Sequence, residues 1–204
     1  MIPYLIVIII SYLLGSISFS IIFGKKFAGI DVRDKGSGNA GTTNVLRTVG
    51  KRAAFFTLVC DVLKGVVAIV IAILISKIWK DINEDLIKYL AGLFVILGHT
   101  FPIFFEFRGG KGVATALGVL IMLDYKIGLI CLIFALIIMV FTRFVSLGSI
   151  MAAVLYPILT IFLVEFKIEK LVLSILIGAM VIFNHRENIK RLKNGTESKV
   201  SLKK

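Results

Sequence analysis

Residues 2–23 read IPYLIVIIISYLLGSISFSIIF and contain no charged side chain. About 20 consecutive apolar residues allow a helix to cross the hydrocarbon core of a bilayer, so this segment predicts a membrane span. A cleaved secretory signal begins with basic residues, and this segment has none before it, so we expect the span to be retained. The same apolar pattern recurs through the chain of 204 residues, which is 58% hydrophobic.

Six further apolar segments follow, each separated from the next by a short polar stretch. They cover residues 53–78, 86–105, 113–123, 127–141, 145–164 and 168–183. The segment at 113–123 is short for a hydrocarbon core of about 30 Å, so it either lies inside the helix bundle or is re-entrant. The sequence predicts an all-α integral membrane protein with about seven transmembrane helices, folded as a single domain over residues 1–204.

The basic residues predict the orientation of this bundle. If all seven segments cross, most of the 24 Lys and Arg residues fall on the side that holds the first loop and the C-terminal tail. The positive-inside rule places that side in the cytoplasm, with the N-terminus outside and the C-terminus cytoplasmic. The net charge of +12 needs no further cause, since such loops also lie against anionic lipid headgroups. The basic segments lack the interleaved aromatics of nucleic-acid sites, so we expect membrane lipid and no nucleic acid as a partner.

The first loop contains more than topology requires. Residues 36–47 read GSGNAGTTNVLR. Glycines let successive backbone N–H groups converge on an anion, the hydroxyls and amides add donors, and Arg47 offers a fork that matches phosphate oxygens. A flexible linker of small polar residues is the alternative, but the ordered series of different donors favours a phosphate site. We expect a helix to begin at Thr42, with its N-terminus toward the anion.

The second loop, residues 107–115, reads FRGGKGVAT. A glycine-rich turn with a lysine at the start of a helix again suits phosphate. A nucleotide P-loop requires glycine six residues before the lysine and Ser or Thr directly after it, whereas positions 105 and 112 are Phe and Gly. The pattern therefore excludes that motif and indicates a smaller phosphorylated ligand.

The third segment, residues 184–197, reads NHRENIKRLKNGTE and begins where the last span ends. Attraction of a basic anchor to anionic lipid explains its lysines but not Asn184, His185 and Asn188, which carry no charge at neutral pH. We therefore interpret these three as candidate donors to substrate. We expect Glu197 to pair with a basic residue and fix the tail.

Two charged side chains lie inside the second apolar segment. Asp61 and Lys64 are spaced to pair on one helical face. Such charges are costly in a membrane and indicate either a functional site or a neutralised pair that positions the helix. His99, just ahead of the second loop, is expected to support that loop by hydrogen bonding. We find no Ser-His-Asp or Cys-His arrangement for an acyl-enzyme, and no metal-ligand spacing, so no metal and no cofactor are expected.

These three loops, in this order and between spans of this kind, resemble the bacterial acyl-phosphate:glycerol-3-phosphate acyltransferases, the PlsY family. The resemblance rests on residues 36–47, on residues 107–115, on the tail pattern from His185 to Glu197, and on Asp61-x-x-Lys64-Gly65. It implies a seven-span enzyme of the cell inner (plasma) membrane with its active site facing the cytoplasm. The enzyme would move a fatty acyl group from acyl phosphate to the 1-hydroxyl of glycerol 3-phosphate. The products would be lysophosphatidate and phosphate, in the first step of bacterial phospholipid synthesis.

The resulting hypothesis assigns one phosphate to each of the first two loops. The candidate catalytic residues are Ser37, Asn44, Arg47 and His185. The candidate substrate-binding residues are Gly38, Asn39, Thr43, Arg108, Gly109, Gly110, Lys111, Gly112, Asn184 and Asn188. The first loop would hold acyl phosphate and the second would hold glycerol 3-phosphate, helped by the tail. The base is either His185, whose ordinary pKa is near neutrality, or a phosphate oxygen of a substrate.

A membrane transporter or channel for a small phosphorylated solute is the alternative reading. It too would use basic, glycine-rich loops and a buried ion pair. Transporter sites usually lie near the bilayer midplane between inverted repeats. The chain shows no such repeat, and its donor-rich loops belong to one side, so we favour the enzyme and expect it to be a monomer.

Overall fold

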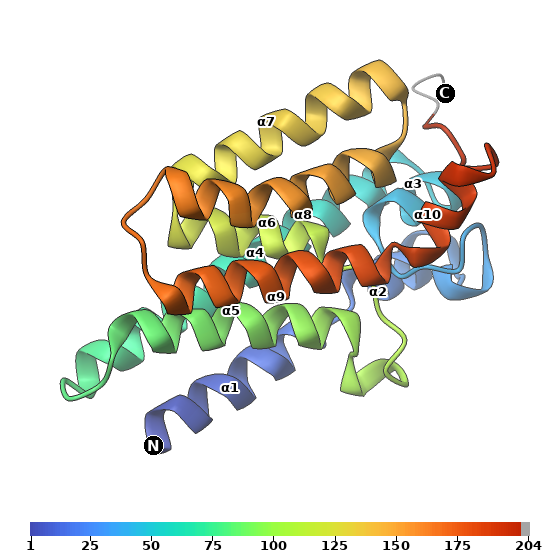
Figure 1. Cartoon of the computed structure of the whole chain (residues 1–204). Coiled ribbons are helices and arrows are strands. Elements are labelled where there is room, and N and C mark those ends of the chain that lie inside the picture. The colour runs from blue at the N-terminus through green and yellow to red at the C-terminus, as the bar shows by residue number, and fades with distance from the viewer. Residues whose placement is uncertain (201–204) are drawn as a thin grey trace. The chain divides into compact units, whose positions relative to one another are not determined.

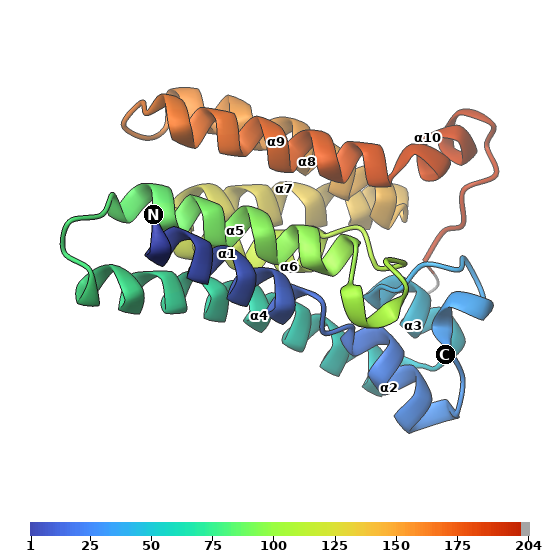
Figure 2. The ribbon, with the colours of Figure 1, turned by 90° about the horizontal axis from the view of Figure 1, so that it is seen from below.

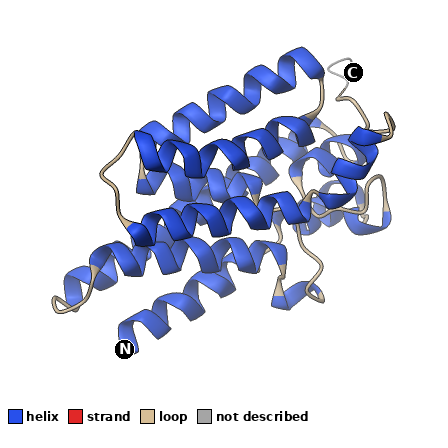
Figure 3. Ribbon diagram, in the orientation of Figure 1, coloured by secondary structure: helices blue, strands red, loops and turns tan. Residues whose placement is uncertain are grey.

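The computed structural model describes residues 1–200, which form two compact units, Met1–Leu123 and the part of the chain from Asp124 onward. Both are helical, and Figure 3 shows helices joined by loops, with no strand in the part of the chain that is described. The all-α prediction is confirmed. The single domain predicted over residues 1–204 stays a prediction.

The first unit contains six α-helices and two short 3-10 helices among its described residues. They are α1 (Ile2–Gly15), α2 (Phe19–Ala28), η1 (Val32–Asp34), α3 (Thr42–Thr48), α4 (Lys51–Ile78), α5 (Glu84–Thr100), η2 (Ile103–Phe105) and α6 (Val113–Leu123) (Figure 1). Helix α5 packs against α1 and α4, and α4 also packs against α6. Figure 2 shows α1, α4 and α5 running side by side. The core of this unit is therefore a set of packed apolar helices with the polar loops at their ends.

Small residues allow the helices of the first unit to approach closely. A side chain at Gly15 would collide with the backbone of Val95, and one at Gly65 would collide with the carbonyl of Thr115. Close backbone approach through glycine is the usual way in which membrane helices gain van der Waals contact. These contacts hold α1 on α5 and α4 on α6, and so fix the helix ends from which the loops emerge.

The first predicted span is broken rather than continuous. Helix α1 ends at Gly15 and α2 begins at Phe19. The freed carbonyls at the break find a donor, because the Lys64 ammonium donates to Gly15 O and to Ile17 O over 3.0 Å each. In a membrane, backbone groups released by a break must be satisfied by neighbouring helices. The sequence pattern of apolar residues carried no sign of this break.

The second unit contains α7 (Tyr125–Thr142), α8 (Val145–Phe162), α9 (Ile168–Asn184) and α10 (Arg186–Lys193). Helix α8 packs against α7 and α9. Helices α9 and α10 meet at His185 with a bend of 58°. The polar tail begins at this bend, as predicted from the end of the last apolar segment.

Each of the seven predicted apolar segments is mainly helical, but the number of crossings is not confirmed. Within residues 1–200, five stretches are long and apolar enough to cross a membrane, and the bent pair α9–α10 would be a sixth. The first of the five joins α1 and α2. Helix α6 has 11 residues, too few for about 30 Å of hydrocarbon at 1.5 Å per residue. Length and composition therefore support five or six candidate spans.

Candidate functional site

The first loop is folded around the side chain of Asn44, which is only 1% exposed. Its Nδ2 donates to Val32 O over 2.7 Å and to Lys35 O over 3.0 Å. Its Oδ1 accepts a hydrogen bond from Ser37 N over 2.9 Å. Both amide hydrogens and the amide oxygen are thus engaged inside the loop. The amide fixes the path of the chain around Ser37.

The other predicted residues of the first loop surround this amide. Gly36 adopts a φ of 61°, a conformation that favours glycine, and a side chain there would overlap Asn44 Oδ1. Helix α3 begins at Thr42, which confirms the predicted start of a helix. Ser37, Gly38 and Arg47 are exposed, whereas Asn39 and Thr43 are half-buried. The loop therefore presents hydroxyl, amide and guanidinium groups on a fixed backbone.

The second loop is anchored to the end of α5. Gly109 N donates to Thr100 O and Gly110 N donates to His99 O, each over 3.1 Å. Gly110 lies against both the His99 imidazole and the carbonyl of Ala40, so a side chain at this position would collide with each of them. Since Ala40 belongs to the first loop, the structure brings the two glycine-rich loops into contact.

Charged and polar groups lie behind the second loop, within the helices. The Lys64 ammonium is 2.9 Å from Asp61 Oδ1, which confirms the predicted ion pair, and both side chains are buried. His99 Nδ1 lies 3.5 Å from the same Asp61 oxygen. The backbone of His99 holds Gly110, and its ring packs on that residue, so the predicted support of the second loop by His99 is present as a backbone bond and a ring contact.

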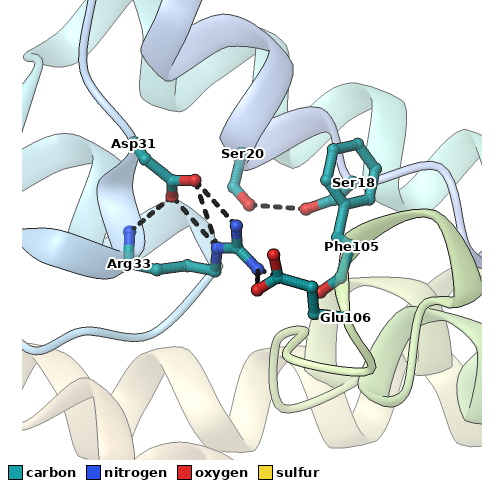
Figure 4. Close-up of polar contacts among 6 residues, drawn as sticks. All are labelled: Ser18, Ser20, Asp31, Arg33, Phe105 and Glu106. Carbon is teal, nitrogen blue, oxygen red and sulfur yellow. Dashed lines mark hydrogen bonds and ion pairs between the residues drawn. The ribbon is translucent and has the colours of Figure 1, made fainter.

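A cluster of four residues joins the two loops and was not predicted from the sequence. It is formed by Asp31, Arg33, Phe105 and Glu106 (Figure 4). Arg33 Nε and Nη2 hold the Asp31 carboxylate at 2.9–3.2 Å, and Arg33 Nη1 donates to Phe105 O over 2.9 Å. The Arg33 guanidinium beside Asp31 holds the pKa of that carboxyl below its usual value. The available signal was the spacing Asp31-x-Arg33 directly ahead of the first loop.

The tail residues belong to the second unit. His185 is 3% exposed, and its Nδ1 is 2.7 Å from Val181 O. A carbonyl can only accept, so Nδ1 carries the proton of the neutral ring, and Nε2 is then the basic nitrogen. Asn184 is half-buried at the last turn of α9, and Asn188 is buried in α10.

Glu197 binds three side chains near the end of this tail. It accepts hydrogen bonds from Ser146 Oγ over 2.7 Å and from Asn188 Nδ2 over 2.6 Å, and it pairs with Arg191 Nε at 2.7 Å. The predicted pairing of Glu197 with a basic residue is confirmed. Burial raises the pKa of the Glu197 carboxyl, but these three donors outweigh burial and leave the pKa below its usual value.

The predicted site residues therefore fall into two groups. Within the first unit the structure brings together the first and second loops, including Arg108, Lys111 and Gly112, the last with a φ of 86°. Asn184, His185 and Asn188 lie in the second unit. Among residues 1–200, no group of three or more His, Cys, Asp or Glu side chains is arranged to hold a metal ion.

Comparison with known proteins gives one consistent answer. The family model described as glycerol-3-phosphate acyltransferase matches residues 5–195. The glycerol-3-phosphate acyltransferase of Clostridioides difficile (strain 630) is 47% identical over 201 residues, covering 98% of this chain and 97% of that protein. That of Shouchella clausii (strain KSM-K16) is 45% identical over 201 residues, covering 96% of this chain and 95% of that protein.

Two solved structures are also similar to this chain. Both are crystal structures of PlsY (YgiH), an integral membrane glycerol 3-phosphate acyltransferase. The glycerol 3-phosphate form has a TM-score of 0.85 and 39% identity, and covers 97% of this chain and 96% of its own. The lysophosphatidic acid form has a TM-score of 0.84 and 38% identity, with coverages of 97% and 95%.

Proposed function

The chain belongs to the glycerol-3-phosphate acyltransferase family, and we propose that it takes its acyl group from acyl phosphate and transfers it to the 1-hydroxyl of glycerol 3-phosphate. It is an integral membrane acyltransferase of phospholipid synthesis that produces lysophosphatidate. The observation that carries the proposal is the contact of Gly110 with Ala40, which places two donor-rich loops side by side. Two adjacent loops suit a reaction in which each substrate carries a phosphate.

The chemistry needs alignment more than a strong nucleophile. An acyl phosphate is a mixed anhydride with a good leaving group. The 1-hydroxyl oxygen of glycerol 3-phosphate attacks the acyl carbonyl carbon, the bond from that carbon to the phosphate oxygen breaks, and phosphate leaves with the electron pair. The hydroxyl proton passes to a base. Donors that stabilise the developing oxyanion, and loops that align the substrates, then supply the catalysis.

We assign acyl phosphate to the first loop. Ser37, Asn39 and Thr43 would donate from the loop and from the start of α3, and Arg47 would neutralise charge. Asn44 acts through the loop rather than on substrate, because its amide is engaged with Val32, Lys35 and Ser37. Asn44 is therefore proposed as the residue that shapes the phosphate-binding backbone.

We assign glycerol 3-phosphate to the second loop. Gly109 and Gly110 would shape the turn, because their N–H groups bond Thr100 O and His99 O. Gly112 would offer its backbone N–H group next to the start of α6, where the helix N-terminus favours an anion. Arg108 and Lys111 would add positive charge beside that group. Asn184 and Asn188 are proposed as additional phosphate donors from the tail.

Two groups are proposed for the base. His185 holds its Nδ1 on Val181 O, which suits proton uptake at Nε2. A phosphate oxygen of a substrate is the other. A general base contributes at least about 100-fold to turnover. A His185→Ala variant that loses less than about 10-fold would therefore leave the substrate phosphate as the base.

We propose that all seven apolar segments cross, the short α6 inside the helix bundle against α4. The N-terminus would lie outside, and the C-terminus and both loops would face the cytoplasm. The support is the exposed basic residues next to the first loop, Lys25, Lys26, Lys51 and Arg52, which the positive-inside rule places in the cytoplasm. A cysteine introduced at Ser198 should resist a membrane-impermeant maleimide in intact cells. Labelling by the impermeant reagent in intact cells would show that the C-terminus lies outside, and would contradict the proposed orientation.

An assay of purified protein tests the proposed function. Protein in detergent is given glycerol 3-phosphate with acyl phosphate, acyl-CoA or acyl carrier protein as separate donors. We expect lysophosphatidate and phosphate to form in equal amounts when acyl phosphate is the donor, and neither product to form with the other two donors. Product formed only with acyl-CoA or acyl carrier protein would overturn the assignment of acyl phosphate as the donor. Uptake of a phosphorylated solute by protein in vesicles, without acyl transfer, would overturn the proposed acyltransferase reaction in favour of a transporter.

A further inference from the structure

The Arg33 guanidinium is oriented by the loop from which it comes. Asp31 caps η1 by accepting from Arg33 N over 2.9 Å, and the same carboxylate accepts from Arg33 Nε and Nη2. The side chains of Arg33 and Asp31 are 12% and 16% exposed. Planar carboxylate–guanidinium pairs of this kind are geometrically specific. The Asp31 carboxylate therefore fixes the direction in which the remaining Nη1 points.

Nη1 points at the turn that precedes the second loop. It donates to Phe105 O over 2.9 Å, and it lies 3.5 Å from Glu106 Oε2, on a side chain that is 74% exposed (Figure 4). Phe105 O also accepts from Arg108 N over 3.1 Å. Both lone pairs of this carbonyl are thus in use, one for the turn itself and one for Arg33.

The turn held by Arg33 has an unfavourable backbone. Glu106 and Phe107 both adopt the left-handed conformation, with φ values of 58° and 57°. Residues other than glycine rarely adopt this conformation, because the Cβ atom crowds the backbone. Residues in such conformations persist when surrounding contacts hold them, and they concentrate at functional sites. The second loop begins within this turn, at Phe107, and continues with Arg108 and Gly109.

We propose that Arg33 is a positioning residue for acyl transfer: it holds the strained turn at residues 105–107 against the first loop, and so sets the separation of the two phosphate-binding loops. The inference rests on the proposed function of these loops. Arg33 itself touches neither substrate. Each loop keeps its own donors when Arg33 is changed, so each substrate still binds, but the attacking hydroxyl and the acyl carbon are no longer aligned.

The test compares Arg33→Lys with the wild type in steady-state kinetics on purified protein. Lysine keeps the charge but cannot hold Asp31 with two bonds and Phe105 O with a third. A displacement of about 1 Å can cost about 100-fold in rate. We expect kcat to fall at least about 10-fold, while KM for acyl phosphate and for glycerol 3-phosphate stays within about 3-fold.

Titration calorimetry with glycerol 3-phosphate separates positioning from loss of folding. Its stoichiometry counts the binding-competent molecules, and kcat is calculated per competent molecule. A merely structural role would lower the stoichiometry and leave that kcat unchanged, which would overturn the inference. If Arg33→Lys does not fold, Asp31→Asn, which keeps the guanidinium, carries the test with the same expected direction.

Asp34→Asn is the matched control, because Asp34 lies in the same 3-10 turn with an exposed side chain. We expect its kcat to stay within about 2-fold of wild type, as for surface substitutions generally. An equal fall in Asp31→Asn and Asp34→Asn, or a wild-type kcat in Arg33→Lys, would overturn the role of Arg33. Arg47→Met and Lys111→Met test the loops themselves: if both keep wild-type KM values, the proposed function of the loops fails, whatever Arg33 does.

Discussion

Asn44 shows how one side chain shapes a binding loop. Its amide bonds Val32 O, Lys35 O and Ser37 N from a buried position. We predict that Asn44→Ala lowers the free energy of unfolding by about 1–3 kcal/mol, because buried partners lose their bonds. Unfolding by SDS titration in mixed micelles measures this loss. Asn194→Ala, at an exposed asparagine, should change it by less than about 0.5 kcal/mol, and an equal loss in both variants would contradict the account.

The Glu197 carboxylate makes the stability of the protein depend on pH. Its pKa lies below the usual value of 4.5, so its stabilisation is complete above that value and is lost as the pH falls through the lowered pKa. Glu197→Gln should therefore show its full deficit in unfolding temperature at neutral pH and a shrinking deficit below about pH 4. Glu187→Gln, at an exposed pair with Lys190, should show little deficit at either pH. A deficit of Glu197→Gln that is constant down to about pH 3 would contradict the sign.

These two residues also show what sequence reasoning can reach at this scale. Residue type and local spacing predicted that Asn44 and Glu197 belong to functional segments, and that Glu197 pairs with a basic residue. The partners Val32 and Ser146 were not predictable, because hydrogen bonds between residues of no periodic spacing depend on the folded path of the chain. The same reason hid Arg33, whose acceptor Phe105 lies in a different loop.

At the scale of elements, the break between α1 and α2 depends on one lysine. The Lys64 ammonium satisfies two carbonyls of the break and pairs with Asp61. We predict that Lys64→Met costs about 3–5 kcal/mol of stability, because it leaves a buried carboxylate without its main counter-charge. The double variant with Asp61→Asn should lose less, since no charge remains buried. A double variant as unstable as Lys64→Met would show that the charge balance is unimportant.

The elements themselves were predictable from apolar length, because a bilayer demands long runs of apolar residues whatever the fold. Each of the seven segments is mainly helical, and α3 begins at Thr42, as predicted from the donors of the first loop. The break at Gly15 was not predictable. Gly15 packs on Val95 and its carbonyl is satisfied by Lys64, and both partners come from other helices.

At the scale of the whole molecule, composition predicted the class but not the number of crossings. Helix α6 is short and the α9–α10 pair is bent, so apolar length alone does not decide how many segments cross. The contact of Gly110 with Ala40 links loops that are separated by two long helices in the sequence. No local pattern predicts that contact, and it is the contact from which a two-phosphate site follows.

The central claim is that each loop binds the phosphate of a different substrate, and two-substrate kinetics of Arg47→Met and Lys111→Met test it most directly. Loss of a charge-assisted bond costs about 1.5–3 kcal/mol, so each variant should raise one KM by about 10-fold or more. Arg47→Met should raise KM for acyl phosphate and Lys111→Met that for glycerol 3-phosphate, while Lys26→Met, at an exposed lysine, changes neither. A rise in KM for the same substrate in both variants would contradict the account.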